Sequence, residues 1–311
     1  MKGYDALRTK AAWLDVSGRG KIRVTGEDRA RLLHAMTTNH IEQLTPGTGC
    51  YAYFLSAQGR ILADVNVLCR PDHFLLDTEP ETREKVYQHL DKFIIADDVT
   101  LEDQTAGTAT ITLEGPAAAG VLKTLGAPAP ESACGNEEWE SGLVVRATVT
   151  GGPGWLLMVP LGARDELIRR LEEAGAEAGD DEAFRTVRIE HGRPRYGEDL
   201  TERYLAQEAN QPRALHFTKG CYLGQEIVER VRSRGQVHRM LVAILLDASE
   251  PPPSGTKLQH EGASVAEITS AAYSPALGKV AGLAYVRTEH AKPGESLELD
   301  GMRGQVVGPG F

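Results

Sequence analysis

Apolar and polar positions divide the chain into an α+β part followed by an all-β part. In the first 126 residues, two-residue alternation predicts strands at 21–25, 51–56, 61–70, 73–77, 99–104 and 108–114. Helical spacing predicts helices at 27–38, from about residue 81, and at 116–125. After the Pro-rich stretch 127–130, strands are expected near 142–149 and 155–159, and helices at 163–174 and 181–191. From residue 239 onward, short strands separated by Pro and Gly turns predict a small β-barrel.

An internal repeat indicates that the α+β part is duplicated. The pattern Ile-x-Val-x-Gly-x-x-x-Ala-x-x-Leu at 22–33 recurs as Ile-x-Leu-x-Gly-x-x-x-Ala-x-x-Leu at 111–122, an offset of 89 residues. A second match relates 74–90 to 155–171, at an offset of 81 residues. Two copies of one split βαβ unit account for both matches. The sequence therefore predicts an α+β protein with a first unit at 1–126, a second at 131–234 and a barrel domain at 236–311.

The stretch richest in reactive residues is the octet Lys219-Gly220-Cys221-Tyr222-Leu223-Gly224-Gln225-Glu226. If this chain is extended, the Lys219 ammonium lies on the same side as the Cys221 thiol and favours the reactive thiolate. A helix is expected to begin at Gln225, because acidic and amide residues crowd a first turn there. The alternative is that Cys221 is a small packing residue, which is the commoner role of a lone cysteine.

Two carboxylates interrupt otherwise apolar patterns. Asp64 shares one face of the strand 61–68 with Asn66 and two leucines, while the opposite face is wholly apolar. If its face is buried, Asp64 needs partners, since unpaired burial costs roughly 2 kcal/mol or more. If the face is solvated, it needs none. Glu190 ends an apolar helix, where the helix dipole disfavours an acid. His191 fits that helix end as a cation better than it fits a catalytic role.

Composition restricts the classes of partner and site. The chain has 311 residues, with 34 Lys and Arg against 44 Asp and Glu, so its net charge of −10 should repel nucleic acid and membranes. A basic segment at 213–239 favours a small anionic ligand, or is a solvated helix face. The four cysteines form no Cys-x-x-Cys motif and the histidines are scattered, so no metal site is expected. We expect the protein to be cytoplasmic, because no signal segment or membrane span is apparent. We also expect it to be a monomer.

Three motifs together resemble the YgfZ-type folate-binding family, a relative of the glycine-cleavage T-protein (aminomethyltransferase). They are the octet, Arg188-Ile189-Glu190-His191-Gly192 and Tyr196-Gly197-Glu198-Asp199-Leu200. The resemblance implies duplicated ferredoxin-like units around a central pocket, a C-terminal barrel, and bound tetrahydrofolate or a derivative. It also implies a role in the assembly or repair of iron–sulfur clusters, with iron–sulfur client or assembly proteins as partners.

The resemblance assigns roles to particular residues. Cys221, assisted by Lys219, would be the functional thiol, and Glu190 would bind the pterin edge through paired hydrogen bonds. Asp64 would line the pterin end, since the catalytic carboxylate of the T-protein comes from this strand. The further folate contacts would be Tyr196, Tyr222, Gln225, Arg230 and Arg239.

Two alternatives stay open for the function. The first is a folate-dependent aminomethyltransferase with a lipoyl-protein partner. It is disfavoured by Ala63, which stands where the T-protein usually has the first of two adjacent acids. The second is a non-catalytic interaction scaffold of the same fold. Whether the protein is an enzyme is left undecided by the sequence.

Overall fold

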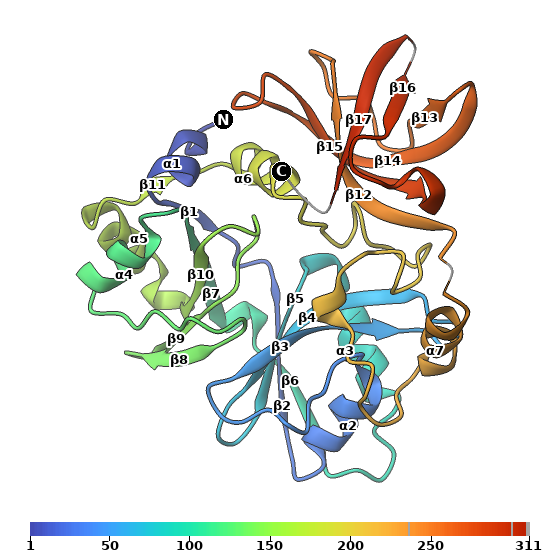
Figure 1. Cartoon of the computed structure of the whole chain (residues 1–311). Coiled ribbons are helices and arrows are strands. Elements are labelled where there is room, and N and C mark those ends of the chain that lie inside the picture. Colours follow the sequence, from blue (N-terminus) through green and yellow to red (C-terminus); the bar gives the residue numbers. More distant parts are fainter. Residues whose placement is uncertain (236, 300, 309–311) are drawn as a thin grey trace.

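The computed structural model describes residues 1–235, 237–299 and 301–308. Two α+β units and a barrel form three lobes that meet around α6 (Asp181–Glu190) and the segment that follows it (Figure 1). Of the predicted barrel domain, its first residue 236 and residues 300 and 309–311 lie outside the described residues. No helix in the described part of the chain is long and apolar enough to cross a membrane.

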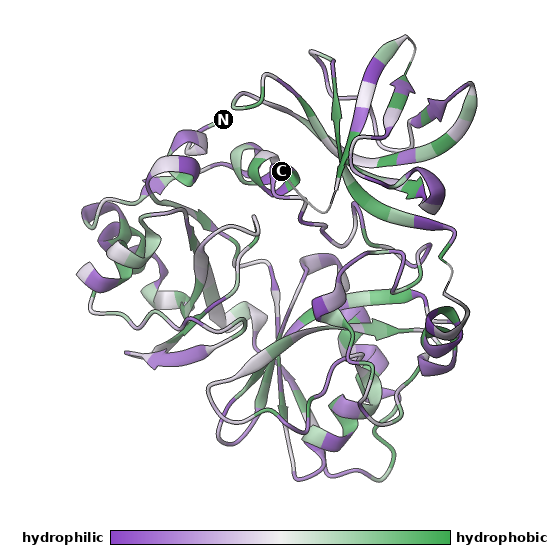
Figure 2. Ribbon diagram, in the orientation of Figure 1, coloured by the Kyte–Doolittle hydropathy of each residue, from purple (hydrophilic) through white to green (hydrophobic). Residues whose placement is uncertain are grey.

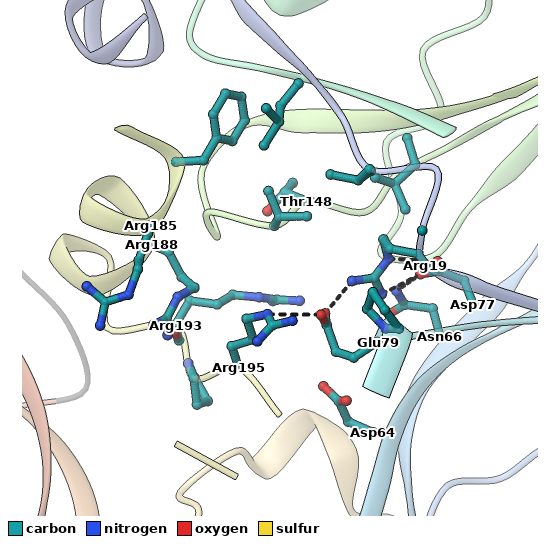
Figure 3. Close-up of a pocket in the computed structure, with 18 of the residues that line it drawn as sticks. Arg19, Asp64, Asn66, Asp77, Glu79, Thr148, Arg185, Arg188, Arg193 and Arg195 are labelled. Atoms are coloured by element: carbon teal, nitrogen blue, oxygen red, sulfur yellow. Dashed lines mark hydrogen bonds and ion pairs between the residues drawn. The ribbon is translucent and has the colours of Figure 1, made fainter. Parts of the chain in front are cut away.

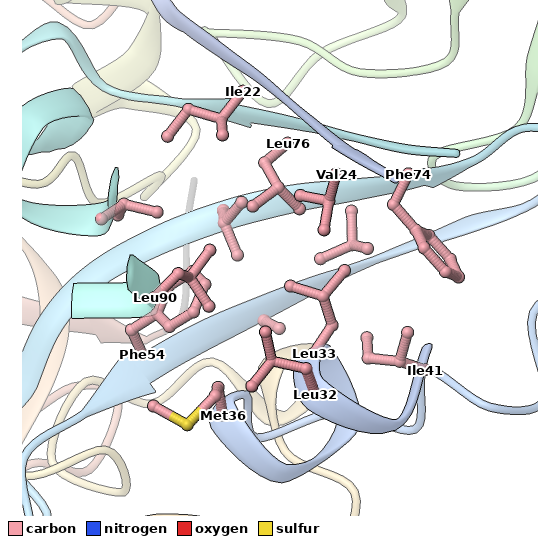
Figure 4. Packing of buried hydrophobic residues seen from close by; sticks show 14 of the residues in the cluster. Ile22, Val24, Leu32, Leu33, Met36, Ile41, Phe54, Phe74, Leu76 and Leu90 are labelled. Carbon is pink, nitrogen blue, oxygen red and sulfur yellow. The ribbon is translucent and has the colours of Figure 1, made fainter. Parts of the chain in front are cut away.

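The first unit is a five-stranded antiparallel sheet in the order β3-β4-β5-β2-β6. Its strands are β2 (Gly20–Thr25), β3 (Gly49–Leu55), β4 (Ile61–Cys69), β5 (Phe74–Thr78) and β6 (Thr100–Asp103). Helices α2 (Arg29–Met36) and α3 (Arg83–Asp91), the latter preceded by η1 (Pro80–Thr82), pack against one face. Figure 4 shows this core, in which Leu33 of α2 and Leu90 of α3 meet Leu76 of β5. The apolar face of β4 lies in this core, as its alternation predicts.

The second unit repeats this arrangement in a six-stranded sheet with the order β11-β1-β7-β10-β9-β8. Its strands are β1 (Ala12–Asp15), β7 (Thr108–Glu114), β8 (Asn136–Trp139), β9 (Gly142–Val145), β10 (Gly154–Pro160) and β11 (Glu177–Ala178). Its helices are α1 (Tyr4–Thr9), α4 (Ala118–Thr124), α5 (Arg164–Glu173) and α6, with short turns η2 (Thr105–Gly107) and η3 (Leu161–Ala163).

The two sheets correspond strand by strand, which accounts for the sequence repeat. β2 followed by α2 matches β7 followed by α4, and β5 followed by α3 matches β10 followed by α5. In the first sheet, β6 pairs with β2. In the second sheet, the corresponding position beside β7 is taken by the N-terminal strand β1. The sheets thus divide the chain differently from the predicted boundary at 126, because β1, β7 and α4 belong to the second sheet.

The glycine shared by both repeats is required by backbone geometry. Gly26 has φ 101° and Gly115 has φ 119°, a region that L side chains rarely adopt. A Cβ at Gly26 would lie 2.0 Å from the carbonyl oxygen of Asp98, and one at Gly115 would lie 2.6 Å from that of Lys10. Each glycine therefore lets the chain pass closely over a neighbouring backbone between strand and helix.

The C-terminal part is a closed six-stranded barrel in the order β12-β15-β14-β13-β16-β17. The strands are β12 (Arg239–Leu246), β13 (Lys257–His260), β14 (Ala263–Ser274), β15 (Lys279–Arg287), β16 (Ser296–Leu299) and β17 (Met302–Gly308). Between the units and the barrel lie η4 (Pro212–Ala214) and α7 (Gln225–Arg234), and η5 (Thr288–His290) follows β15. Figure 2 shows apolar and polar residues mixed along β13, β16 and β17, whereas β12 is largely apolar. The predicted barrel is confirmed.

Candidate functional site

A cavity of about 410 Å³ opens where the two sheets and α6 meet (Figure 3). Such a volume lies within the range of roughly 300–1,000 Å³ that small-molecule sites occupy. The residues of its wall that bear on chemistry are Arg19, Tyr51, Asp64, Asn66, Asp77, Glu79, Arg188, Arg193 and Arg195. The polar face of β4 points here, because the opposite face of that strand is buried in the first core.

Asp64 is the acid of this wall with a buried carboxylate oxygen that lacks a hydrogen-bond partner among the described residues. Its Oδ2 accepts a hydrogen bond of 2.8 Å from the Tyr51 hydroxyl, whereas its buried Oδ1 has no hydrogen-bond partner within the described residues. Burial, assisted by the negative charge of Glu79, raises the pKa of Asp64 to about 6. A carboxyl group with this pKa and a free oxygen can take up or release a proton near neutral pH.

Two other acids of the wall, Asp77 and Glu79, are paired with arginines. Arg19 binds Asp77 in a bidentate manner, with Nε–Oδ1 and Nη2–Oδ2 distances of 2.8 and 2.9 Å, and also pairs with Glu79. Glu79 receives a second ion pair of 3.0 Å from Nε of Arg195. These pairs, drawn in Figure 3, hold β5 and the start of η1 against the segment after α6. Asp64 differs from Asp77 and Glu79 in that it forms no ion pair with an arginine among the described residues.

Two arginines near Tyr51 carry positive charge without an acidic partner. The guanidinium carbon of Arg193 lies 5.8 Å from the centre of the Tyr51 ring, and that of Arg213 lies 4.4 Å from it. Neither forms an ion pair within residues 1–235, 237–299 and 301–308. Burial and the charge of Arg213 lower the pKa of Arg193, as expected for cations that lack an anion. This end of the site is suited to an anionic, aromatic ligand.

Glu190, expected at the pterin edge, is not among the residues that line the cavity. One carboxylate oxygen accepts hydrogen bonds of 2.5 Å from both the Tyr4 and the Ser274 hydroxyls. The other forms an ion pair of 2.6 Å with Arg8. The side chain is 3% exposed and joins α1, α6 and β14. With both oxygens engaged, Glu190 acts as a structural connector between the second unit and the barrel.

The Lys219 ammonium is bound by backbone carbonyl groups. Its buried ammonium donates to the backbone carbonyls of His34, Thr37 and Asn39, at 2.5, 2.6 and 2.7 Å. All three of its N–H groups are therefore used at the C-terminal end of α2. Burial lowers the pKa of Lys219 to about 8. Cys221 is exposed and does not line the cavity. The octet thus anchors α2 with its lysine and presents its cysteine to the surroundings.

The remaining predicted folate contacts also lie away from the cavity wall. Tyr196 is buried with its hydroxyl 3.4 Å from the Ile61 carbonyl, and Tyr222 stacks beneath the Lys219 ammonium at 4.9 Å. Gln225 accepts a hydrogen bond from the Tyr222 backbone at the start of α7. Arg230 pairs with Glu226 at 2.6 Å, and Arg239 pairs with Glu208 at 3.0 Å. Three arginines of the basic segment, Arg230, Arg232 and Arg239, are thus paired with acids. Among the expected folate contacts, Asp64 alone lines the cavity.

Sequence reasoning missed both the partners of Asp64 and a cluster of histidines. Tyr51 lies on β3 directly beside β4, and the hairpin signal at 57–60 could have indicated this pairing. Arg193 follows α6 in a segment without periodicity, so no local pattern marks it. His34, His40 and His216, scattered in the sequence, pack with ring centroids 4.6 and 5.2 Å apart. Scattered positions along the sequence thus come together in space for these three histidines.

Comparison with known proteins gives the family. Residues 2–219 match the GCVT N-terminal domain, and residues 239–308 match the glycine cleavage T-protein C-terminal barrel domain. An aminomethyltransferase of Rubrobacter xylanophilus is 31% identical over 92% of this chain and 78% of its own length. A putative chloroplastic transferase of Arabidopsis thaliana is 26% identical over 96% of this chain and 70% of its own length.

A solved structure supports the same assignment at the level of the fold. The glycine cleavage system aminomethyltransferase T of Bartonella henselae superposes with a TM-score of 0.89, at 21% identity, over 98% of this chain and 87% of its own. Both units and the barrel are therefore shared. The chain belongs to the glycine cleavage T-protein family, with a GCVT N-terminal domain followed by the family's C-terminal barrel.

Proposed function

We propose that this protein binds a reduced folate in the central cavity and that Asp64 serves as the acid–base group at its reacting end. The observation that carries the proposal is the free Oδ1 of Asp64, in a cavity whose other acids near it are paired. A pterin offers N–H groups that an unpartnered carboxylate oxygen accepts. A reduced folate also carries an aromatic ring and glutamate carboxylates, which suit Tyr51 and the guanidinium of Arg193.

Each residue contributes a separate function in this site. Asp64 accepts or returns a proton, and its raised pKa lets it do both near neutrality. Tyr51 holds the second oxygen of that carboxylate in place. Arg193 and Arg213 attract the anionic tail of the ligand. A bound tetrahydrofolate would supply the nitrogen that carries a one-carbon unit.

Folate-dependent aminomethyl transfer is the reaction that best suits this arrangement. Relatives over nearly the whole chain are named aminomethyltransferase. Transfer of the methylene carbon from a lipoyl sulfur to tetrahydrofolate breaks its bonds to sulfur and to the amine nitrogen, frees the thiol and releases ammonia. Protons must move between these groups, and we assign that role to Asp64. The partner in this reaction would be a protein that carries the group on a lipoyl arm.

A YgfZ-type role in iron–sulfur cluster assembly or repair is the second candidate. Two observations favour it: Ala63 replaces the first of the two acids usual in the T-protein, and the octet presents an exposed Cys221. In this role the folate site is retained, while iron–sulfur client or assembly proteins replace the lipoyl partner. The two candidate functions therefore use the same folate cavity and differ in the partner protein that binds at the surface.

Tetrahydrofolate titration, followed by quenching of tryptophan fluorescence, tests the shared part. We expect one site per chain, with affinity lowered at least about tenfold in Arg193→Ala because a charge-assisted contact is lost. Arg230→Ala is the matched control, since Arg230 pairs with Glu226 outside the cavity. Absence of saturable binding would favour the scaffold alternative and refute the proposal.

An assay of methylene transfer from aminomethyl-lipoyl protein to tetrahydrofolate then separates the two candidates. Turnover that Asp64→Asn abolishes and Cys221→Ser leaves intact supports aminomethyl transfer. Folate binding without turnover supports the YgfZ-type role. In that case, Cys221→Ser should lower the activity of iron–sulfur enzymes in cells that depend on this protein.

A further inference from the structure

Two histidines and one glutamate meet at the surface of the barrel. None of the three lines the cavity described above. His260 ends β13, His290 ends η5, and Glu295 immediately precedes β16. Their imidazole nitrogens and carboxylate oxygen lie within 4.8 Å of one another. Each side chain is partly exposed, at 22–27%, so an ion from solvent can reach all three.

The spacing of these atoms matches that of ligands around one metal ion. Oε1 of Glu295 lies 2.9 Å from Nδ1 of His290 and 3.6 Å from Nε2 of His260. Two zinc ligands at about 2.0–2.1 Å from the ion in tetrahedral geometry are about 3.3 Å apart. The observed distances bracket that value, so small side-chain rotations bring all three atoms to coordination distance.

Hydrogen bonding around the cluster sets one histidine in the form that a metal requires. Nδ1 of His260 lies 2.9 Å from the Ser296 carbonyl oxygen. A carbonyl can only accept, so this nitrogen carries the proton and Nε2 keeps its lone pair for a metal. The second ring has a looser outer contact, since Nε2 of His290 lies 3.7 Å from the exposed Glu289 carboxylate, beyond hydrogen-bond distance. His260 therefore has the outer hydrogen bond typical of a metal-binding histidine.

We propose that His260, His290 and Glu295 form a binding site for a divalent transition-metal ion such as Zn²⁺. Two imidazoles and one carboxylate are a ligand set that zinc commonly takes, with the fourth position left to water or another ligand. The site revises the expectation that this chain has no metal centre. It is independent of the folate site and of the function proposed there.

The ion would link β13 to the segment before β16, two strands that share few backbone pairs. β13 and β16 share one residue pair, Gln259 with Glu298, whereas β12 and β15 pair over eight residues. His260 comes from β13, while His290 and Glu295 come from the connection that leads into β16 (Figure 1). A metal bound to all three would cross-link the two sides of this seam. Binding should therefore stabilise the barrel by mass action.

Zinc titration of tag-free protein by isothermal calorimetry tests the site. Cys221→Ser is used as the background, because the exposed thiol could itself bind zinc. After chelator treatment, we expect one Zn²⁺ per chain and a rise in melting temperature. His260→Ala, His290→Ala and Glu295→Gln should each weaken binding more than about tenfold. His73→Ala is the control, since His73 contacts a single carboxylate, that of Asp72.

Substitution with Co²⁺ adds a readout of coordination, because visible absorption bands report a tetrahedral site that contains nitrogen ligands. Loss of these bands in any folded ligand variant supports the proposal. Circular dichroism identifies variants that fail to fold, and the remaining two variants then decide. The proposal is overturned if zinc binds only at millimolar concentration, or if all three variants bind as tightly as the His73→Ala control.

Discussion

Replacement of Glu190 by alanine should destabilise the protein without weakening folate binding. The substitution removes the acceptor of two buried hydroxyls, those of Tyr4 and Ser274. Each buried hydroxyl left unpaired costs about 1–3 kcal/mol. The ion pair with Arg8 adds at most about 1 kcal/mol, because Arg8 is 37% exposed and regains water. The free energy of unfolding should therefore fall by about 2–7 kcal/mol.

Urea unfolding, followed by circular dichroism and tryptophan fluorescence, measures this loss. The matched control is Glu182→Ala on the same helix, whose side chain is 75% exposed and whose removal should change stability by less than about 0.5 kcal/mol. Tetrahydrofolate affinity is measured in parallel under conditions where the variant is folded. A change in unfolding free energy below about 1 kcal/mol would refute the structural role. Loss of folate affinity at unchanged stability would return Glu190 to the pterin site.

Three further predictions concern titration, anchoring and thiol reactivity. Because the pKa of Asp64 is raised to about 6 in the folded state, its ionisation costs stability as pH rises. The advantage of Asp64→Asn in unfolding free energy should grow by about 1–2 kcal/mol between pH 5 and pH 8, and a constant difference would contradict the raised pKa. Lys219→Met should lower the unfolding free energy by roughly 3 kcal/mol or more in urea titrations, since three carbonyls lose their donor; a melting curve like that of the wild type would show that the anchor is dispensable. Cys221 should be alkylated first in peptide mapping at neutral pH, because burial raises the pKa of Cys50 to about 12 and of Cys134 to about 11. Faster labelling of either buried thiol in the folded protein would contradict this order.

Local patterns in the sequence predicted most of the longer elements and their repetition, but not short ones such as α1 and β1. The alternation in residues 61–68 separates the buried face of β4 from the face that carries Asp64, because successive side chains of a strand point to opposite sides. Gly224, with φ 84°, precedes a helix that begins at Gln225 as predicted. The repeated glycines mark the same strand-to-helix turn in both units. The barrel followed from short strands punctuated by Pro and Gly.

Only the tertiary structure decided what the polar side chains meet. Glu190 is bound by Tyr4, 186 residues away, and Lys219 by the backbone of His34, 185 residues away. A sequence motif shows that such residues occur together along the chain, but it does not show which distant groups will satisfy them. The same holds for Tyr51 beside Asp64, for the unpaired Arg193, and for the meeting of His260 with His290. Local periodicity encodes which face is buried, whereas hydrogen-bond partners and charges depend on how separate elements pack.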